Sequence, residues 1–97
     1  MTFKISNEAG NDLENIWLYT FETWSVEQAD RYLNLIIDEI EHLSKNPTSG
    51  KDVSYIRKDY FRSKVNTHFI FYKSNDEKKE IEIIRILHEQ MDIDSHL

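Results

Sequence analysis

The spacing of hydrophobic residues changes once along this chain, from a helical period before Pro47 to a strand period after residue 60. In the first part, two stretches place apolar side chains about every 3.6 residues, which marks one face of an amphipathic α-helix. In the second part, apolar and polar residues alternate, as they do on a β-strand with two different faces. A single change of period predicts a helical layer followed along the chain by a sheet.

The predicted elements follow one another in a simple order. A short strand over residues 3–5 comes first, and two helices then begin after Ser6 and at the capping-box sequence of residues 25–28. The second helix ends at Asn46, because the following proline disfavours helical geometry in the residue before it. Short polar connections favour an antiparallel meander of three strands, over residues 61–65, 68–72 and 81–87. The prediction is an α+β fold of strand, two-helix hairpin and three-stranded meander, with the helices on one face of the sheet and the other face partly open.

Length and composition limit the class of protein. A chain of 97 residues with 39% hydrophobic and 31% charged residues fits one folded domain over residues 1–97. It has no cysteine, which excludes disulfides and thiolate chemistry and fits a reducing compartment, so we expect a cytoplasmic protein without leader or membrane partner. It also lacks a phosphate loop, dinucleotide-binding glycines, a nucleophile elbow and a His-Glu-x-x-His motif. We therefore expect no cofactor.

Charge is distributed unevenly around the net value of −6. Residues 1–46 have nine acids and three bases, residues 47–73 have two acids and six bases, and residues 74–97 have seven acids and three bases. The acidic balance argues against direct nucleic-acid binding outside a complex with a target. Any contact with a polyanion is expected at the bases of the central segment, and an equally good explanation of these bases is a solvated rim of the sheet. They are Lys51, Arg57, Lys58, Arg62, Lys64 and Lys73.

Arg85 is the most unusual charged residue of the predicted strands. Strict alternation places it on one face with Ile81, Ile83 and Leu87, where an unpaired guanidinium is costly. We expect a carboxylate such as Glu89 or Asp92 to pair with it, ahead of a catalytic role.

An RNA-cleaving site is the alternative use of the basic residues. Such a site needs a base for the ribose 2′-hydroxyl, an acid for the leaving oxygen and cations for the phosphorane. The candidate catalytic set is Arg62, Lys64, Arg85 and His88, with Arg57 and Lys58 nearby in the sequence. Arg62 and Lys64 are equally explained as the outward residues of an amphipathic strand.

The remaining histidines and aromatic residues predict structure more than chemistry. The spacing of His88, Asp92 and His96 suits a metal ion only on a helical tail, and we predict no metal site. His68 is predicted to be a hydrogen-bonded histidine at the sheet edge and not a general base. Five aromatic residues have core spacing and are predicted to pack in the interior, namely Trp17, Trp24, Tyr32, Phe61 and Phe69.

Several stretches, taken in order and spacing, resemble the ParE toxins of the RelE/ParE toxin–antitoxin superfamily over nearly the whole chain. They are Ser6-Asn7-Glu8-Ala9 with Asp12-Leu13 and Ile16-Trp17, Trp24 with Ala29 and Tyr32, Asn46-Pro47, His68-Phe69-Ile70-Phe71-Tyr72, and Arg85-Ile86-Leu87-His88 followed by Met91-Asp92-Ile93 and His96-Leu97. The resemblance implies the same helical hairpin on an antiparallel sheet that the periodicity predicts.

For function, the resemblance implies the toxin of a type II toxin–antitoxin system of the plasmid-stabilising kind, which poisons DNA gyrase by binding. In the RelE-like branch the same fold cuts messenger RNA on the ribosome, and His88 stands about where that branch has a C-terminal tyrosine or histidine. The acidic balance favours the gyrase branch, so we expect a binding protein and, if an enzyme, an endoribonuclease. A third alternative is an inactive relic that only binds its antitoxin.

The implied partner is a ParD-like antitoxin in a heterotetramer. We expect an amphipathic helix and an extended segment of that partner to lie along the hairpin and the sheet edge. The second predicted helix would present its exposed face to it, and the candidate antitoxin-binding residues are Asp30, Asn34, Asp38 and Glu41.

Overall fold

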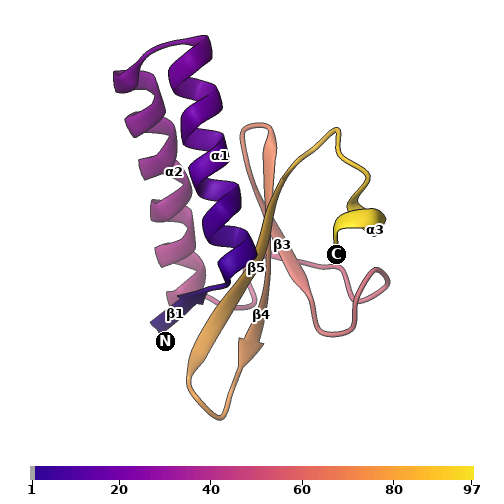
Figure 1. The fold of residues 1–97 in the computed structure, drawn as a ribbon. Coiled ribbons are helices and arrows are strands. Elements are labelled where there is room, and N and C mark those ends of the chain that lie inside the picture. Colours follow the sequence, from indigo (N-terminus) through magenta and orange to yellow (C-terminus); the bar gives the residue numbers. More distant parts are fainter. Residues whose placement is uncertain (1) are drawn as a thin grey trace.

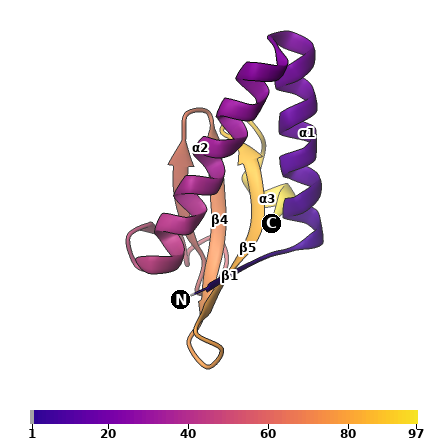
Figure 2. The ribbon, with the colours of Figure 1, turned by 90° about the vertical axis from the view of Figure 1, so that its left-hand side faces the viewer.

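The computed structural model describes residues 2–97 and contains the predicted elements in the predicted order. A helical hairpin lies on one side of a five-stranded sheet, and a short C-terminal helix lies on the other (Figures 1 and 2). The elements are β1 (Thr2–Ile5), α1 (Asn7–Thr23), α2 (Val26–Lys45), β2 (Lys51–Asp52), β3 (Phe61–Val65), β4 (His68–Asn75), β5 (Glu80–His88) and α3 (Ile93–His96).

Serine side chains begin both long helices. The Ser6 hydroxyl accepts a hydrogen bond of 3.0 Å from the Ala9 amide and donates one of 2.8 Å to the Ile84 carbonyl, which ties the start of α1 to β5. The Ser25 hydroxyl accepts from the Gln28 amide at 3.0 Å, so the predicted cap of α2 is confirmed. The caps fix where the hairpin starts and turns.

The sheet contains the predicted antiparallel meander of β3, β4 and β5 and two further pairings. Its strand order is β1-β5-β4-β3-β2, with β1 parallel to β5 and β2 antiparallel to β3. Because β1 pairs only with residues 80–83 of β5, the rest of β5 forms an edge of the sheet. The start of α1 lies against this edge.

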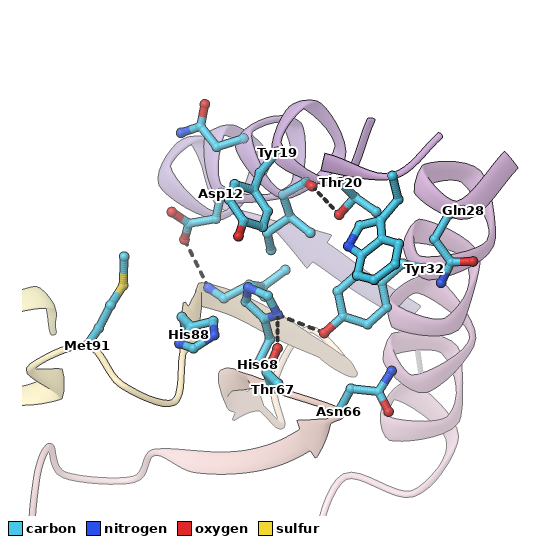
Figure 3. Close-up of a pocket in the computed structure, with 14 residues that line it drawn as sticks. Asp12, Tyr19, Thr20, Gln28, Tyr32, Asn66, Thr67, His68, His88 and Met91 are labelled. Atoms are coloured by element: carbon cyan, nitrogen blue, oxygen red, sulfur yellow. Dashed lines mark hydrogen bonds between the residues drawn. The ribbon is translucent and has the colours of Figure 1, made fainter. Parts of the chain in front are cut away.

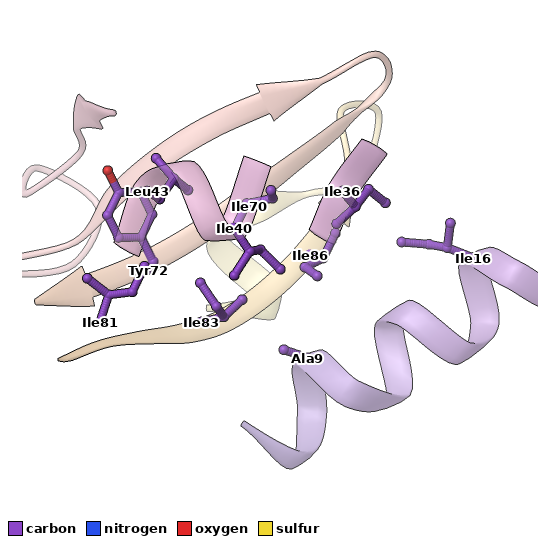
Figure 4. Packing of buried hydrophobic residues seen from close by; sticks show 10 residues of the cluster. All are labelled: Ala9, Ile16, Ile36, Ile40, Leu43, Ile70, Tyr72, Ile81, Ile83 and Ile86. Carbon is purple, nitrogen blue, oxygen red and sulfur yellow. The ribbon is translucent and has the colours of Figure 1, made fainter. Parts of the chain in front are cut away.

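Two apolar clusters lie on opposite faces of the sheet. The larger one joins the hairpin to the sheet (Figure 4) and contains Ala9, Ile16, Ile36, Ile40, Leu43, Ile70, Tyr72, Ile81, Ile83 and Ile86. The smaller one contains Val53, Phe71 and Leu87, against which the loop before β3 and the C-terminal residues Ile93 and Leu97 pack. The second face, predicted to be partly open, is thus partly covered by these two segments.

A β-bulge in β5 changes which side chains share a face. Phe71 of β4 pairs with Arg85, but the next residue, Tyr72, pairs with Ile83, so Ile84 is an extra residue in β5. The predicted alternation is therefore wrong at one point: Arg85 shares a face with Leu87 but not with Ile81 and Ile83. Strict alternation cannot foresee a bulge.

Candidate functional site

Arg85 is the centre of an ion-pair cluster at the edge of the sheet. Its Nε and Nη2 donate to the two carboxylate oxygens of Asp12 at 2.8 and 2.9 Å, and its Nη1 lies 3.4 Å from Glu8. Nη1 also donates to the carbonyl of His96 at 3.1 Å. The bonds to Asp12 raise the pKa of Arg85 above its ordinary value. Arg85 therefore joins α1, β5 and α3 and stays charged.

The prediction of a carboxylate partner for Arg85 is confirmed, but the predicted partners are wrong. Glu89 instead forms an ion pair of 2.7 Å with Lys64, and Asp92 accepts a hydrogen bond of 2.7 Å from Ser95. Asp12 is 73 residues from Arg85 along the chain, so only the packing of α1 against β5 brings the two together.

The structure does not assemble the four residues of the nuclease hypothesis. Arg62 and Lys64 pair with Phe71 and Phe69 of β4, on the sheet face opposite the hairpin. Arg85 lies at the edge and is held by carboxylates, whereas His88 lies in a cleft on the hairpin side. Arg62 and Arg85 both pair with Phe71, so the register puts Arg62, Lys64 and Arg85 on one face of the sheet, but His88 lies on the other.

The cleft lies between the free end of the hairpin and the end of the sheet, and it has a volume of about 630 Å³. Tyr19 from the hairpin and Met91 from the segment after β5 line it with exposed apolar surface (Figure 3). Trp24 of the hairpin also lines it and is exposed. Ile16 and Ile86 also line it. An apolar concavity open to solvent is typical of a surface that receives a partner or ligand.

Trp24 does not pack in the interior as predicted. Its side chain is 75% exposed, although it continues the apolar spacing of Ile16 and Thr20. Helix α1 ends at Thr23, beyond the sheet, so no strand covers the last turn of its apolar stripe. Sequence spacing identifies an apolar face but not the point at which the covering sheet ends.

Two histidines and a tyrosine form the polar part of the cleft. The Tyr32 hydroxyl lies 2.7 Å from Nδ1 of His68 and donates to the Val65 carbonyl at 3.0 Å. The His88 ring meets the His68 ring edge-on at 5.2 Å between centroids. Burial, followed by the charge of His88, lowers the pKa of His68 to about 4. The prediction that His68 is hydrogen-bonded is thus confirmed, but His68 has strand partners on both sides, Val65 and His88, and does not lie on an edge strand.

Stability should depend on pH through His68. Its pKa of about 4 lies below the 6.5 of an unperturbed histidine, so between these pH values His68 is protonated in the unfolded chain but not in the folded chain. The free energy of unfolding should therefore fall between pH 6.5 and 4, by on the order of 1 kcal/mol because cleft water screens the charge. Urea unfolding across this pH range measures the free energy of unfolding. If a His68→Gln variant keeps the full pH dependence, another group causes it.

The remaining predicted residues lie on other surfaces. Asp30, Asn34, Asp38 and Glu41 are exposed on α2, and Asp30 accepts a hydrogen bond of 2.9 Å from the Trp17 indole. Among residues 2–97, no group of three His, Cys, Asp or Glu side chains could hold a metal ion, and α3 is too short to align His88 with His96. No helix in this range is long and apolar enough to cross a membrane.

The fold and the site define a small α+β domain with an apolar cleft between its helical hairpin and the end of its sheet. The structure matches a chain of the chromosomal ParDE TA system from P. aeruginosa with a TM-score of 0.77, over 91% of this chain and 95% of that chain. Sequence identity there is 20%, so this likeness concerns the fold.

Sequence comparison identifies the family. The chain is 34% identical over 95 residues to Toxin ParE1 of Mycobacterium tuberculosis, covering 98% of this chain and 96% of the relative. Toxin ParE1 of Caulobacter vibrioides is also 34% identical over 95 residues, with the same coverage. The family model "ParE toxin of type II toxin-antitoxin system, parDE" matches residues 3–93. The chain belongs to this family of toxins.

Proposed function

We propose that this ParE-family toxin inhibits growth by binding and poisoning DNA gyrase, and that a ParD-like antitoxin neutralises it in a heterotetramer. The family provides the toxin–antitoxin context. The observation that favours binding over catalysis is the state of Arg85, whose donors are engaged by Asp12, Glu8 and a backbone carbonyl. A guanidinium held in this way has little capacity left to stabilise a phosphorane.

A gyrase assay tests the proposal directly. Purified toxin added to gyrase, ATP and relaxed plasmid should inhibit supercoiling and accumulate cleaved DNA, while transcripts in a translation extract stay intact. Prior addition of antitoxin should abolish the effect. Normal supercoiling at large toxin excess would refute gyrase poisoning, and cut transcripts would favour the nuclease alternative. No effect in either assay, together with unimpaired growth on expression, would indicate a relic that only binds antitoxin.

The apolar cleft is the proposed site for an amphipathic segment of the antitoxin. Tyr19 and Trp24 are large aromatic side chains on its rim, and such residues dominate binding energies when a partner covers them. The acidic outer face of α2 remains the second proposed contact, through Asp30, Asn34, Asp38 and Glu41.

Truncation of the cleft aromatics should weaken antitoxin binding. We expect Trp24→Ala to raise the dissociation constant about 30-fold, equivalent to about 2 kcal/mol. The reason is that the complex loses the apolar surface that the antitoxin buries against the indole. Tyr55→Ala is the matched control, since Tyr55 is 74% exposed in the loop before β3 and lies outside the cleft. Calorimetric titration with the antitoxin measures both. Equal losses in the two variants, or a larger loss in Asp38→Asn, would move the contact away from the cleft.

A further inference from the structure

We propose that the sheet face opposite the hairpin carries a contact surface for a phosphodiester backbone, formed by Lys51, Arg62 and Lys64. We call these three residues the basic triad. The inference rests on the proposed function for its biological setting, because the triad would hold the DNA that gyrase has cleaved. The ability of the triad to bind phosphate is argued from the positions and contacts of its three side chains.

The register of the sheet brings the three charges together. Lys51 of β2 and Arg62 of β3 are direct cross-strand partners, and Lys64 is two residues farther along β3 on the same face. Like charges directly opposite one another destabilise a strand pair. The acid next to Lys51 offers no relief, because Asp52 pairs with Phe61 on the other face and accepts from the Ser54 amide at 2.8 Å. The sheet thus holds positive charges where strand pairing disfavours them.

Phe69 fixes the position of two of these cations. The guanidinium carbon of Arg62 lies 4.3 Å from the centroid of the Phe69 ring, and the ammonium of Lys64 lies 5.6 Å from the same centroid. Stacking on the ring leaves the edge of the guanidinium, with its N–H groups, directed away from the ring. Little side-chain freedom then remains to be lost when Arg62 binds an anion.

Arg62 has donors to spare. Within residues 2–97, its side chain has no ion pair and no hydrogen bond, whereas Lys64 has Glu89 at 2.7 Å and Arg85 has Asp12 at 2.8 Å. A planar guanidinium with free N–H groups suits the bidentate recognition of phosphate oxygens. Arg62 is therefore the central cation of the triad, and Lys51 is its direct cross-strand partner.

The spacing of the triad fits a nucleic-acid strand. Alternate side chains on one face of a strand are about 6.6 Å apart, and neighbouring strands are about 4.8 Å apart. The first distance is close to the separation of successive phosphates along one strand of DNA. Arg62 and Lys64 can therefore reach adjacent phosphates, with Lys64 exchanging its half-exposed ion pair with Glu89 for a phosphate.

The remaining charge explains why such a surface acts only within a complex. The chain has a net charge of −6, and the outer face of the hairpin carries acids, among them Asp38 and Glu41. A molecule with this separation of charge turns its sheet face toward DNA, but its net charge keeps the affinity for free DNA low. A protein target that holds the toxin beside DNA supplies a high effective concentration, at which three cations suffice.

The test uses the full chain with Lys51→Gln and Arg62→Gln combined, and the matched control combines Lys78→Gln and Lys79→Gln in the turn between β4 and β5. The variant should bind gyrase without DNA as the wild type does, but need at least 10-fold more toxin to trap cleaved DNA. In a plot of the logarithm of the apparent affinity for trapping against the logarithm of the salt concentration, the slope should become shallower by about two, one for each lost phosphate contact. The control should behave as the wild type in every assay.

A second measurement does not require gyrase. A short DNA duplex titrated into labelled toxin at low salt should shift the amide resonances of β2 and β3, and the double variant should lose these shifts. Its melting temperature should change little, because the relief of like-charge repulsion offsets the loss of the Arg62 contact with Phe69.

The outcomes separate the two proposals. If the wild type leaves gyrase unaffected but DNA still shifts β2 and β3, the gyrase target is wrong and the phosphodiester surface stands. Unchanged trapping in the double variant, or shifts located elsewhere, would overturn the surface. Loss of gyrase binding without DNA would show that the triad contacts an acidic protein surface instead.

Discussion

Replacement of Asp12 by alanine is expected to lower the free energy of unfolding by about 3 kcal/mol, among the largest effects of any single charged residue in this chain. The carboxylate accepts two hydrogen bonds from Arg85 and a third, of 2.9 Å, from the Ile86 amide at the exposed edge of β5. The side chains of Asp12 and Arg85 are only 13% and 17% exposed. Without Asp12, a largely buried guanidinium and a backbone amide both lose their partner.

Urea unfolding at neutral pH measures the effect, and the corresponding loss of melting temperature is about 15 °C for a domain of this size. Glu8→Ala is the matched control, because Glu8 lies 3.4 Å from Arg85 and is 73% exposed, and it should cost less than about 0.5 kcal/mol. The double variant Asp12→Ala with Arg85→Ala should lose less than the sum of the single variants. Equal and small losses for Asp12→Ala and Glu8→Ala would show that the pair contributes no more than a surface contact.

The ion pair also has a consequence for the cleft. Asp12 and His88 both line the cleft. Arg85 of β5 binds Asp12 of α1 and the His96 carbonyl of α3, and so ties these elements together. A variant that loosens this cluster should widen the space between the hairpin and the end of the sheet. Antitoxin binding by Asp12→Ala should therefore weaken even where the protein remains folded.

Local signals made most of the fold predictable. The capping serines, Asn46 before proline and the change of period are short-range features, and each physical rule that links them to structure acts within a few residues. The parallel pairing of β1 with β5 depends on residues almost 80 positions apart, and β2 is only two residues long. No local pattern specifies such pairings.

The site was less predictable because its features depend on where helices and strands end and on a β-bulge that changes the strand register. An unpaired Arg85 is costly in any sheet, so the need for a carboxylate follows from sequence, but the choice of Asp12 follows from the crossing of α1 over the edge of β5. The bulge at Ile84 reverses the face of Arg85 relative to Ile83. The exposure of Trp24 depends on the hairpin extending past the sheet.

Gly50→Ala is expected to destabilise the fold by about 3 kcal/mol, through close packing and not through backbone conformation. Gly50 has no positive φ angle, so alanine fits its backbone. An added Cβ would lie 2.8 Å from the Arg62 carbonyl oxygen and even closer to the hydroxyl of Tyr72. That hydroxyl accepts from the Gly50 amide at 3.1 Å and donates to the Pro47 carbonyl at 2.9 Å. The fully buried Tyr72 would have to move, and both hydrogen bonds would be lost.

The chain's other glycine provides a control of opposite sign. Gly10 lies within α1 and has no atom within 4 Å of an added Cβ, so Gly10→Ala should stabilise the protein by about 0.5–1 kcal/mol through helix propensity. Gly50→Ala combined with Tyr72→Phe should cost less than the two changes added, because the hydroxyl that clashes is gone while the Arg62 carbonyl remains. Thermal unfolding of the four variants decides the matter. Strictly additive losses, or a Gly50→Ala variant as stable as the wild type, would mean that the crossing from α2 to β2 moves away from Tyr72 at little cost.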